Sequence, residues 1–296
     1  MKFRLIEEER SHHSVSRLAR VLGVTAAGYH AWRKRTPCAR ELEDERLRGR
    51  IRHHFEASHG TYGSPRLLDD LADEGIRVSR KRIARLMREL GIAGISGREG
   101  RPRRRRSAAP ESEPAMDLVR RAFAADEPNQ VWFADITYVP TWEGWLYLAV
   151  VMDACTKRIV GWSMRDDLRA DIVIDALGMA TTMRRPEPGL VHHSDRGAQY
   201  RSLAFGRTLR DSGILASMGA TGVPHDNAVT ESVMATIKKE CVHRYRFKTK
   251  DEARFTIFSY IEVFYNRHRR HSSLGNLSPE EFERRLEQRI DEVAAC

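Results

Sequence analysis

Cysteine is scarce in this chain. Its 296 residues contain only four, Cys38, Cys155, Cys241 and Cys296, and no two of them form a C-x-x-C pair. A disulfide scaffold and a cysteine-based zinc finger are therefore poorly supported. No apolar run approaches the ~18–20 residues that a membrane span needs, and residues 1–13 lack the apolar stretch of a secretory signal. These absences predict a reduced, soluble, cytoplasmic protein with no membrane association.

Acidic residues are too few to balance the basic ones in the first third of the chain. The net charge is +10, and residues 1–110 alone carry +12, with 26 Lys and Arg against 14 Asp and Glu. Such an uneven distribution indicates a front part that binds a polyanion. The steepest run lies in an expected exposed linker, where we expect phosphate contacts from Arg103, Arg104, Arg105 and Arg106.

Two helix pairs are expected in this basic part. Residues 14–35 predict a helix-turn-helix, with Gly23 at the break and Thr25 as the cap of the second helix. Residues 64–90 predict another pair, in which Ser79 caps a basic helix. A short helix pair whose second helix is basic suits a DNA groove. The DNA contacts expected from this helix are Arg80, Lys81, Arg82 and Arg85.

From residue 131 onward the pattern changes to strands. Three β-rich segments, at 131–139, 145–152 and 158–164, predict an antiparallel meander. Helices at 170–183, 202–212 and 230–242 then alternate with strands at 190–194 and 214–218. The order βββαβαβα predicts an α/β fold in which helices flank a mixed sheet. This order matches the ribonuclease-H-like fold.

The chain is therefore expected to contain five regions. They are an N-terminal helix-turn-helix region at 1–40, a second helix-turn-helix-like DNA-binding domain at 41–96, a basic and proline-rich linker at 97–125, a ribonuclease-H-like core with a five-stranded sheet at 126–245, and a helical C-terminal region at 246–296.

Three acidic residues occupy positions at which a carboxylate needs a partner or a metal ion. Asp135 interrupts an apolar strand, Asp195 follows the strand at 190–194, and Glu231 lies in the first turn of the helix at 230–242. Hard oxygen donors with no cysteine nearby favour Mg²⁺, or Mn²⁺ as its substitute, over zinc. Carboxylates that hold two such ions catalyse displacement at a phosphodiester. We therefore expect Asp135, Asp195 and Glu231 to be both catalytic and metal-binding residues.

The helix at 230–242 indicates how Glu231 is presented. An arc of roughly 100° is expected to pack on the sheet. That arc contains Val233, Met234, Ile237 and Cys241. Glu231 and Lys238 lie seven residues apart and almost eclipsed on its flank. Lys238 is therefore expected to contact a DNA phosphate near the acids.

Other polar residues near the acids leave alternatives open. His192 and His193 precede the second acid and are either metal ligands or hydrogen-bonded structural groups. Asp153, which ends the second strand, and Asp226, which precedes the helix, are each a candidate fourth acid. For Asp226 the neighbouring asparagine favours a role in shaping the loop, because such side chains bond nearby backbone groups.

Several motifs, in this order along the chain, are similar to those of one known family. They are Val21–Trp32, Tyr62–Arg66, Val78–Met87, Asn129–Tyr138, Gly144–Asp153, His193–Tyr200, Asp226–Ser232 and Tyr265–Leu274. Over nearly its whole length the chain resembles the second-frame protein of insertion-sequence-3 transposases, within the superfamily of DDE transposases and retroviral integrases.

The resemblance implies that Asp135, Asp195 and Glu231 are the DDE acids, with the family's 35 residues between the second and third, and that Lys238 is the family's basic residue after the glutamate. It implies Mg²⁺-dependent cleavage at the terminal inverted repeats of a mobile element and direct joining of the 3′-hydroxyl to target DNA. A homo-oligomer on DNA, associated with a bacterial nucleoid, and a first-frame protein as partner follow from the same resemblance.

One departure and two rival functions remain. His225 stands where the family has an aromatic residue, which concerns the loop before Glu231 rather than the acids. A DNA-binding regulator that needs the first-frame partner would occupy element ends without cutting them. A ribonuclease-H-like nuclease of repair or RNA processing would hydrolyse strands without joining 3′ ends.

Overall fold

The computed structural model describes residues 2–95, 125–219 and 228–294, and the side chains at 228–231 and 293–294 are not among the described groups. Arg103–Arg106 of the expected linker, together with His225 and Asp226, therefore lie outside the described residues. Within the described ranges, no helix has the length and apolar character needed to cross a membrane.

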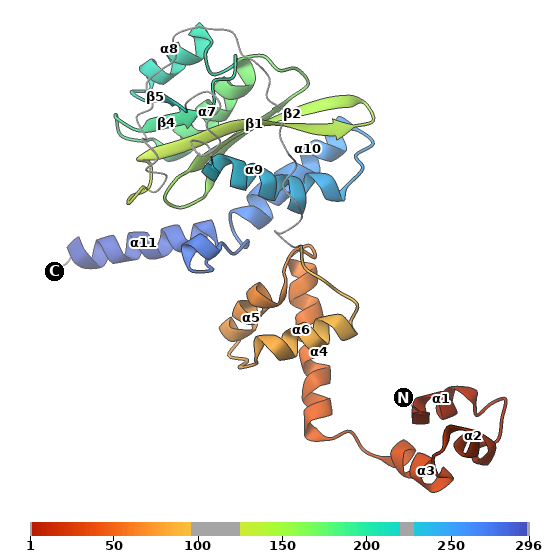
Figure 1. Cartoon of the computed structure of the whole chain (residues 1–296). Coiled ribbons are helices and arrows are strands. Elements are labelled where there is room, and N and C mark those ends of the chain that lie inside the picture. The colour runs from red at the N-terminus through yellow and green to blue at the C-terminus, as the bar shows by residue number, and fades with distance from the viewer. Residues whose placement is uncertain (1, 96–124, 220–227, 295–296) are drawn as a thin grey trace.

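A mixed five-stranded sheet forms the centre of the larger, C-terminal part of the chain (Figure 1). Its strands are β1 (Val131–Thr141), β2 (Gly144–Asp153), β3 (Ile159–Arg165), β4 (Val191–Ser194) and β5 (Leu215–Met218). They lie in the order β3-β2-β1-β4-β5. Pairing is antiparallel among β1, β2 and β3, whereas β4 is parallel to both of its neighbours. The predicted meander and the predicted order of strands and helices are confirmed.

Helices cover both faces of this sheet (Figure 1). They are α7 (Asp171–Arg184), α8 (Leu203–Asp211), α9 (Ala228–Glu240) and α10 (Lys250–Phe258). Because side chains alternate along a strand, Trp132 and Ala134 of β1 pack with the apolar residues of α7 and α8. Phe133 and Val139 pack on the other face with those of α9 and α10. The parity of a position in β1 therefore decides which helices its side chain meets.

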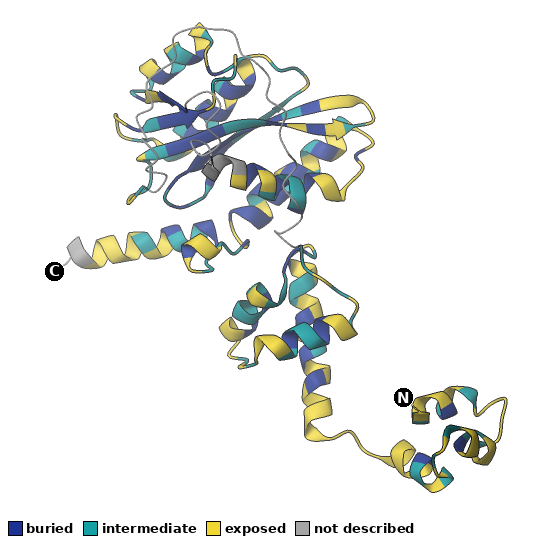
Figure 2. Ribbon diagram, in the orientation of Figure 1, coloured by how far each residue is buried: buried dark blue, intermediate teal, exposed yellow. Residues whose placement is uncertain are grey.

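Two helix clusters precede the sheet. The first contains α1 (Lys2–Glu9), α2 (Val15–Leu22) and α3 (Ala26–Lys34), and the second contains α4 (Ala39–Ala57), α5 (Ser64–Asp73) and α6 (Arg80–Glu89). Both predicted caps are confirmed, since the Thr25 hydroxyl accepts the Gly28 N–H at 3.0 Å and the Ser79 hydroxyl accepts the Arg82 N–H at 3.3 Å. Figure 2 shows the buried residues of α4, α5 and α6 gathered where these helices meet.

The C-terminal region is helical, as predicted, but its middle is a π-helix. α10 continues into a π-helical stretch at Ser259–Tyr265, and α11 (Pro279–Ala294) comes after a short irregular segment. One side of this region is apolar and buried, and contains Ala253, Ile257, Tyr260, Ile261 and Phe264. The wider turn also buries Tyr265. A π-turn was not predicted, because one extra residue in a turn leaves no distinct mark on apolar spacing.

Candidate active site

Two of the three predicted acids come from neighbouring strands at the centre of the sheet. β1 and β4 pair in parallel, and the last pair of their register joins Ala134 to Ser194. The next residue on each segment is a predicted acid, Asp135 within β1 and Asp195 directly after β4. Since neighbouring strands lie about 4.8 Å apart, this register brings together two carboxylates that are distant in the chain.

The negative charges of Asp135 and Asp195 both affect the pKa of one buried tyrosine, Tyr200. Asp135 is half-buried and its Oδ1 accepts the N–H of Ile136 at 2.8 Å, while Asp195 is exposed and its Oδ1 accepts the N–H of Gly197 at 2.9 Å. Tyr200 is buried, and its hydroxyl has no hydrogen-bond partner among the described residues. Burial raises the pKa of Tyr200 well above its ordinary value, and the negative charges of Asp135 and Asp195 raise it further. The charges of both carboxylates therefore reach the same buried tyrosine.

The helix that carries Glu231 packs on the face of β1 to which Asp135 belongs. Asp135 follows Phe133 by two residues, so both side chains point toward the face that α9 covers. The predicted arc is confirmed, since Val233, Met234 and Ile237 of α9, and Cys241 directly after it, are all buried in the same core cluster as Phe133. Lys238 is half-buried on the flank of that arc. Glu231 lies in the first turn of α9, but its side chain is outside the described groups, so its meeting with the aspartates stays a prediction.

The predicted DNA contacts on α6 fall into two groups. Arg80 and Lys81, at the start of the helix, are exposed. Arg82 and Arg85 each form an ion pair with Asp44 of α4 at 2.7 Å. The hydrogen bond from Arg85 and then that from Arg82 lower the pKa of Asp44 against the effect of desolvation. Arg82 and Arg85 therefore join α6 to α4, and a phosphate contact by either of them stays a prediction.

The two histidines before Asp195 are built into the core. The Nδ1 atom of His193 lies 2.9 Å from the Ser217 hydroxyl, and its ring meets that of Phe133 edge-on. His192 packs against the rings of Tyr200 and Phe205 on the opposite face. Burial lowers the pKa of His192 to about 4. These contacts favour the structural alternative, and no cluster of three metal-ligating side chains occurs in the described part of the chain.

Asp153 holds a turn together rather than joining the aspartate pair. It is fully buried, and its Oδ1 accepts the N–H groups of Cys155 and Thr156 at 3.0 and 2.8 Å and the Thr156 hydroxyl at 3.1 Å. Its Oδ2 accepts the N–H of Asn129 at 2.7 Å. In the sheet Asp153 lies opposite Trp132, whereas Asp135 lies opposite Val150. Both carboxylate oxygens of Asp153 are thus engaged by the backbone, away from Asp135.

A second charged cluster, which the sequence patterns missed, lies at the other end of α9. Glu240 is buried, and its carboxylate accepts two hydrogen bonds from Arg269, at 2.6 and 2.7 Å. Desolvation by itself raises the pKa of Glu240, but the hydrogen bonds and charge of Arg269 outweigh it, so that the pKa is lowered. A buried pair between residues far apart in the chain has no local pattern. Its one sequence signal was that Arg269 belongs to the motif Tyr265–Leu274.

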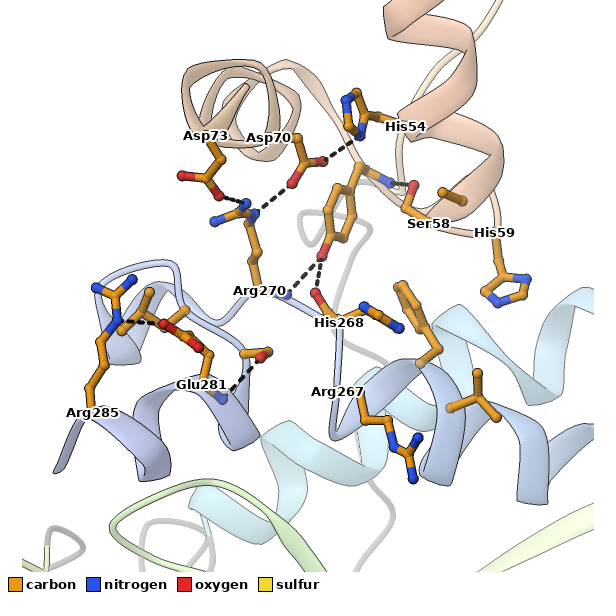
Figure 3. Close-up of a pocket in the computed structure, with 16 residues that line it drawn as sticks. His54, Ser58, His59, Asp70, Asp73, Arg267, His268, Arg270, Glu281 and Arg285 are labelled. Atoms are coloured by element: carbon orange, nitrogen blue, oxygen red, sulfur yellow. Dashed lines mark hydrogen bonds and ion pairs between the residues drawn. The ribbon is translucent and has the colours of Figure 1, made fainter. Parts of the chain in front are cut away.

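A cavity of about 720 Å³ opens elsewhere, where α4 and α5 meet the C-terminal region (Figure 3). Its charged groups pair with one another, since Arg270 binds Asp70 at 2.6 Å and also Asp73, and Arg285 binds Glu281 at 2.6 Å. None of the residues that line it is a predicted catalytic residue. The cavity marks a contact between two parts of the chain rather than the site of the acids.

Models of three known domains match the chain. The model of an HTH-like domain matches residues 41–100. Two different models of the integrase core domain match the overlapping ranges 125–224 and 212–279. Together with the observed sheet order, the integrase core places the chain in the class of polynucleotidyl transferases with a ribonuclease-H-like catalytic core.

Relatives from insertion sequences are similar over almost their whole length. A 31 kDa protein of insertion element IS600 from Shigella sonnei is 42% identical over 92% of this chain and 99% of that protein. The transposase InsF of IS3A from Escherichia coli K12 is 38% identical over 96% of this chain and 98% of that protein. The transposase of IS904 from Lactococcus lactis is 39% identical over 84% of this chain and 98% of that protein. The chain therefore belongs to the IS3 family of insertion-sequence transposases.

Among solved structures, the catalytic core of HTLV-2 integrase in complex with magnesium aligns with 53% of this chain and 97% of that chain. The sequences are 15% identical and the TM-score is 0.42. A likeness of that size does not bear on activity.

Proposed function

We propose that this chain cuts DNA at the ends of its own insertion sequence and joins the free 3′-hydroxyl to target DNA, with Asp135, Asp195 and Glu231 as the catalytic acids. The observation that supports the proposal is the register of β1 on β4, in which Asp135 of β1 follows Ala134 and Asp195 directly follows its partner Ser194 at the end of β4. Open α/β sheets bind ligands at the carboxyl ends of their strands. The third acid comes from α9, the helix that packs on the face to which Asp135 points.

The residues at this point of the sheet fit a divalent cation. Asp135 and Asp195 supply hard oxygen donors from neighbouring segments of the sheet. Their negative charges both raise the pKa of Tyr200. Such donors suit Mg²⁺ or Mn²⁺. We infer that Asp135, Asp195 and Glu231 hold two Mg²⁺ ions, with Mn²⁺ as a substitute. When bound, such ions activate a hydroxyl and stabilise the leaving oxygen of a phosphodiester.

The chain's own residues orient the carboxylates and the DNA. One oxygen of Asp135 and one of Asp195 is held by a backbone N–H, which fixes how each carboxylate is turned. Lys238 lies seven residues beyond Glu231, about 10.5 Å along α9. A cation at that distance reaches a phosphate of a strand whose reacting bond lies at the acids. Lys238 therefore positions DNA in this proposal and takes no part in bond making.

The N-terminal clusters supply the remaining DNA contacts. Arg80 and Lys81 stand exposed at the start of α6, where the positive end of the helix adds to their charge. The arginines Arg103–Arg106 are proposed to contact the phosphate backbone of the DNA as well. The terminal inverted repeats are the specific partner and target DNA is the second. A homo-oligomer on DNA, the first-frame protein as partner, and a place at the bacterial nucleoid in the cytoplasm complete the proposal.

End-cleavage and strand-transfer assays test this function. The purified protein, alone and with the first-frame protein, is incubated with labelled element-end DNA and Mg²⁺. Asp135→Asn and Glu231→Gln are expected to abolish cleavage and joining while end binding persists. Wild-type cleavage by either variant would overturn the assignment of the acids. Binding without nicking by the wild-type pair of proteins would favour the regulator instead, and hydrolysis without joining would favour the nuclease.

A further inference from the structure

The buried cluster at the C-terminal end of α9 joins three parts of the chain. Glu240 is the last residue of α9, Arg269 belongs to the segment after the π-helix, and both are largely buried, at 7% and 6% exposure. The Arg269 guanidinium donates two hydrogen bonds to the Glu240 carboxylate, and the Tyr260 hydroxyl donates a third at 3.0 Å. Arg66 of α5 approaches the same carboxylate at 3.5 Å. Glu240 is thus bound from the C-terminal region and from the HTH-like domain at once.

The residues on both sides of Arg269 in the chain bind the α4–α6 cluster, and Figure 3 shows one of them, Arg270, beside Asp70 and Asp73. The Tyr62 hydroxyl accepts the N–H of Arg270 at 2.8 Å and donates to the carbonyl of His268 at 3.0 Å. Arg270 binds Asp70 and Asp73 of α5. Arg66 lies over the Tyr62 ring, 5.2 Å from its centroid. The backbone on both sides of Arg269 is therefore fixed against the α4–α6 cluster, and this fixes the direction from which Arg269 meets α9.

The contact between α9 and the sheet lacks such directional bonds over its apolar part. Val233, Met234 and Ile237 bury an apolar arc against β1, and apolar burial is non-directional, so it allows a helix to turn or slide by small amounts. A two-pronged Arg–carboxylate bond has a set geometry. Glu231 precedes Glu240 by nine residues, which is about 13.5 Å on one helix. A rotation or shift permitted at Glu240 therefore reaches Glu231.

We propose that Glu240 and Arg269 are a positioning pair that sets the rotation and axial place of α9, and through it the place of Glu231, with Arg66 tying the HTH-like domain to the same carboxylate. The inference rests on the proposed catalytic role of Glu231. Neither Glu240 nor Arg269 touches the reacting groups in this account.

Glu240→Gln in the full chain with the first-frame protein tests the proposal. We expect kcat for end cleavage to fall about 10-fold or more, which is the usual effect of removing a residue that orients a metal ligand without binding the metal itself. KM for the DNA end is expected to stay unchanged. Mn²⁺ affinity, measured on the protein without DNA by electron paramagnetic resonance, is expected to fall as well. Arg269→Lys keeps the positive charge but loses the paired hydrogen bonds of the guanidinium. Its kcat and its Mn²⁺ affinity should both fall less than those of Glu240→Gln.

Glu283→Gln is the matched control. Glu283 of α11 is also buried and bound by two arginines, Arg158 and Arg184, but neither partner belongs to α9. Its variant is expected to lose stability while it keeps Mn²⁺ affinity and kcat per folded molecule. Equal effects of Glu240→Gln and Glu283→Gln on all three quantities would overturn the positioning role.

A double variant separates positioning from folding. Glu240→Leu with Arg269→Met removes both charges, so neither is left buried and unpaired, and stability is expected to return toward that of the wild type. Mn²⁺ affinity and kcat should stay low, because the directional bond is still missing. Recovery of both together with stability would overturn the proposal. If Asp135→Asn still cleaves, the proposed function itself has failed, and a lowered Mn²⁺ affinity in Glu240→Gln would then no longer be tied to catalysis.

Discussion

Asp153→Asn tests whether the carboxylate that ends β2 is structural or a fourth catalytic acid. Asparagine has almost the same size and shape, so the substitution changes hydrogen bonding and charge alone. If the amide oxygen takes the place of Oδ1, it keeps the bonds to Cys155 and Thr156. The amide NH₂ then replaces Oδ2 and faces the N–H of Asn129, a donor against a donor.

The structure sets the size of the effect. The variant loses one hydrogen bond to a charged acceptor, worth roughly 1.5–3 kcal/mol, and weakens three others that had an ionised acceptor. We expect the free energy of unfolding to fall by about 3 kcal/mol. Urea unfolding at neutral pH, followed by tryptophan fluorescence, measures it, since Trp132 lies opposite Asp153 in the sheet.

Activity decides between the two roles. Cleavage per folded Asp153→Asn molecule should equal that of the wild type, because the side chain lies away from Asp135. Asp135→Asn is the matched comparison and should behave in the opposite way. It removes one of two neighbouring negative charges, so stability is kept or raised, while cleavage is lost. An Asp153→Asn protein that is as stable as the wild type but inactive would refute the reasoning and make Asp153 a fourth acid.

Three further predictions concern charge and burial. Glu240→Gln should reduce the loss in free energy of unfolding that occurs as the pH falls below neutral. The pKa of Glu240 in the folded state lies below 4.5, so the stabilisation by its carboxylate is complete above that pH and is lost as the pH falls through the folded-state value. A change in the free energy of unfolding between about pH 6 and about pH 3 that is the same in variant and wild type would contradict this. Lys81→Ala should weaken binding to all DNA sequences evenly and reduce the slope of log affinity against log salt by about one, as measured by fluorescence anisotropy, whereas an unchanged slope would remove Lys81 from the interface. Tyr200→Phe should leave stability unchanged or raise it by up to about 2 kcal/mol, because the deleted hydroxyl is buried without a partner among the described residues; thermal unfolding that shows a loss of similar size would mean that the hydroxyl is bonded after all.

Much of the fold could be predicted from local patterns. The order of strands and helices, the caps at Thr25 and Ser79, and the buried arc of α9 follow from alternation, from helical spacing and from residues close to one another in the chain. Asp135 and Asp195 stand out in the sequence for the same reason, since a carboxylate inside or directly after an apolar strand is visible without any partner.

The partners of charged residues were the part that local patterns left undetermined. Arg82 and Arg85 were predicted to contact DNA, and the sequence did not show that both also bind Asp44, on a helix about forty residues earlier in the chain. Asp153 read as a possible catalytic acid, yet Asn129 and the turn after β2 use its oxygens. Glu240 carried no signal at all. The pattern of charges along the sequence shows which side chains are charged. It does not predict which distant residue will form an ion pair with each of them.

The amino-acid sequence by itself determined the elements and the chemical character of this protein: a basic helical N-terminal part, a mixed sheet, and acids within a strand, directly after a strand and at the start of a helix. Only the tertiary structure decided that Asp135 and Asp195 come together, because the parallel register of β1 on β4 is a choice between segments distant in the chain. The tertiary structure also decided which charged residues form buried ion pairs that stabilise the fold, as Glu240 and Arg269 do. A buried charge needs an oppositely charged partner nearby in space, and that partner can lie anywhere in the sequence.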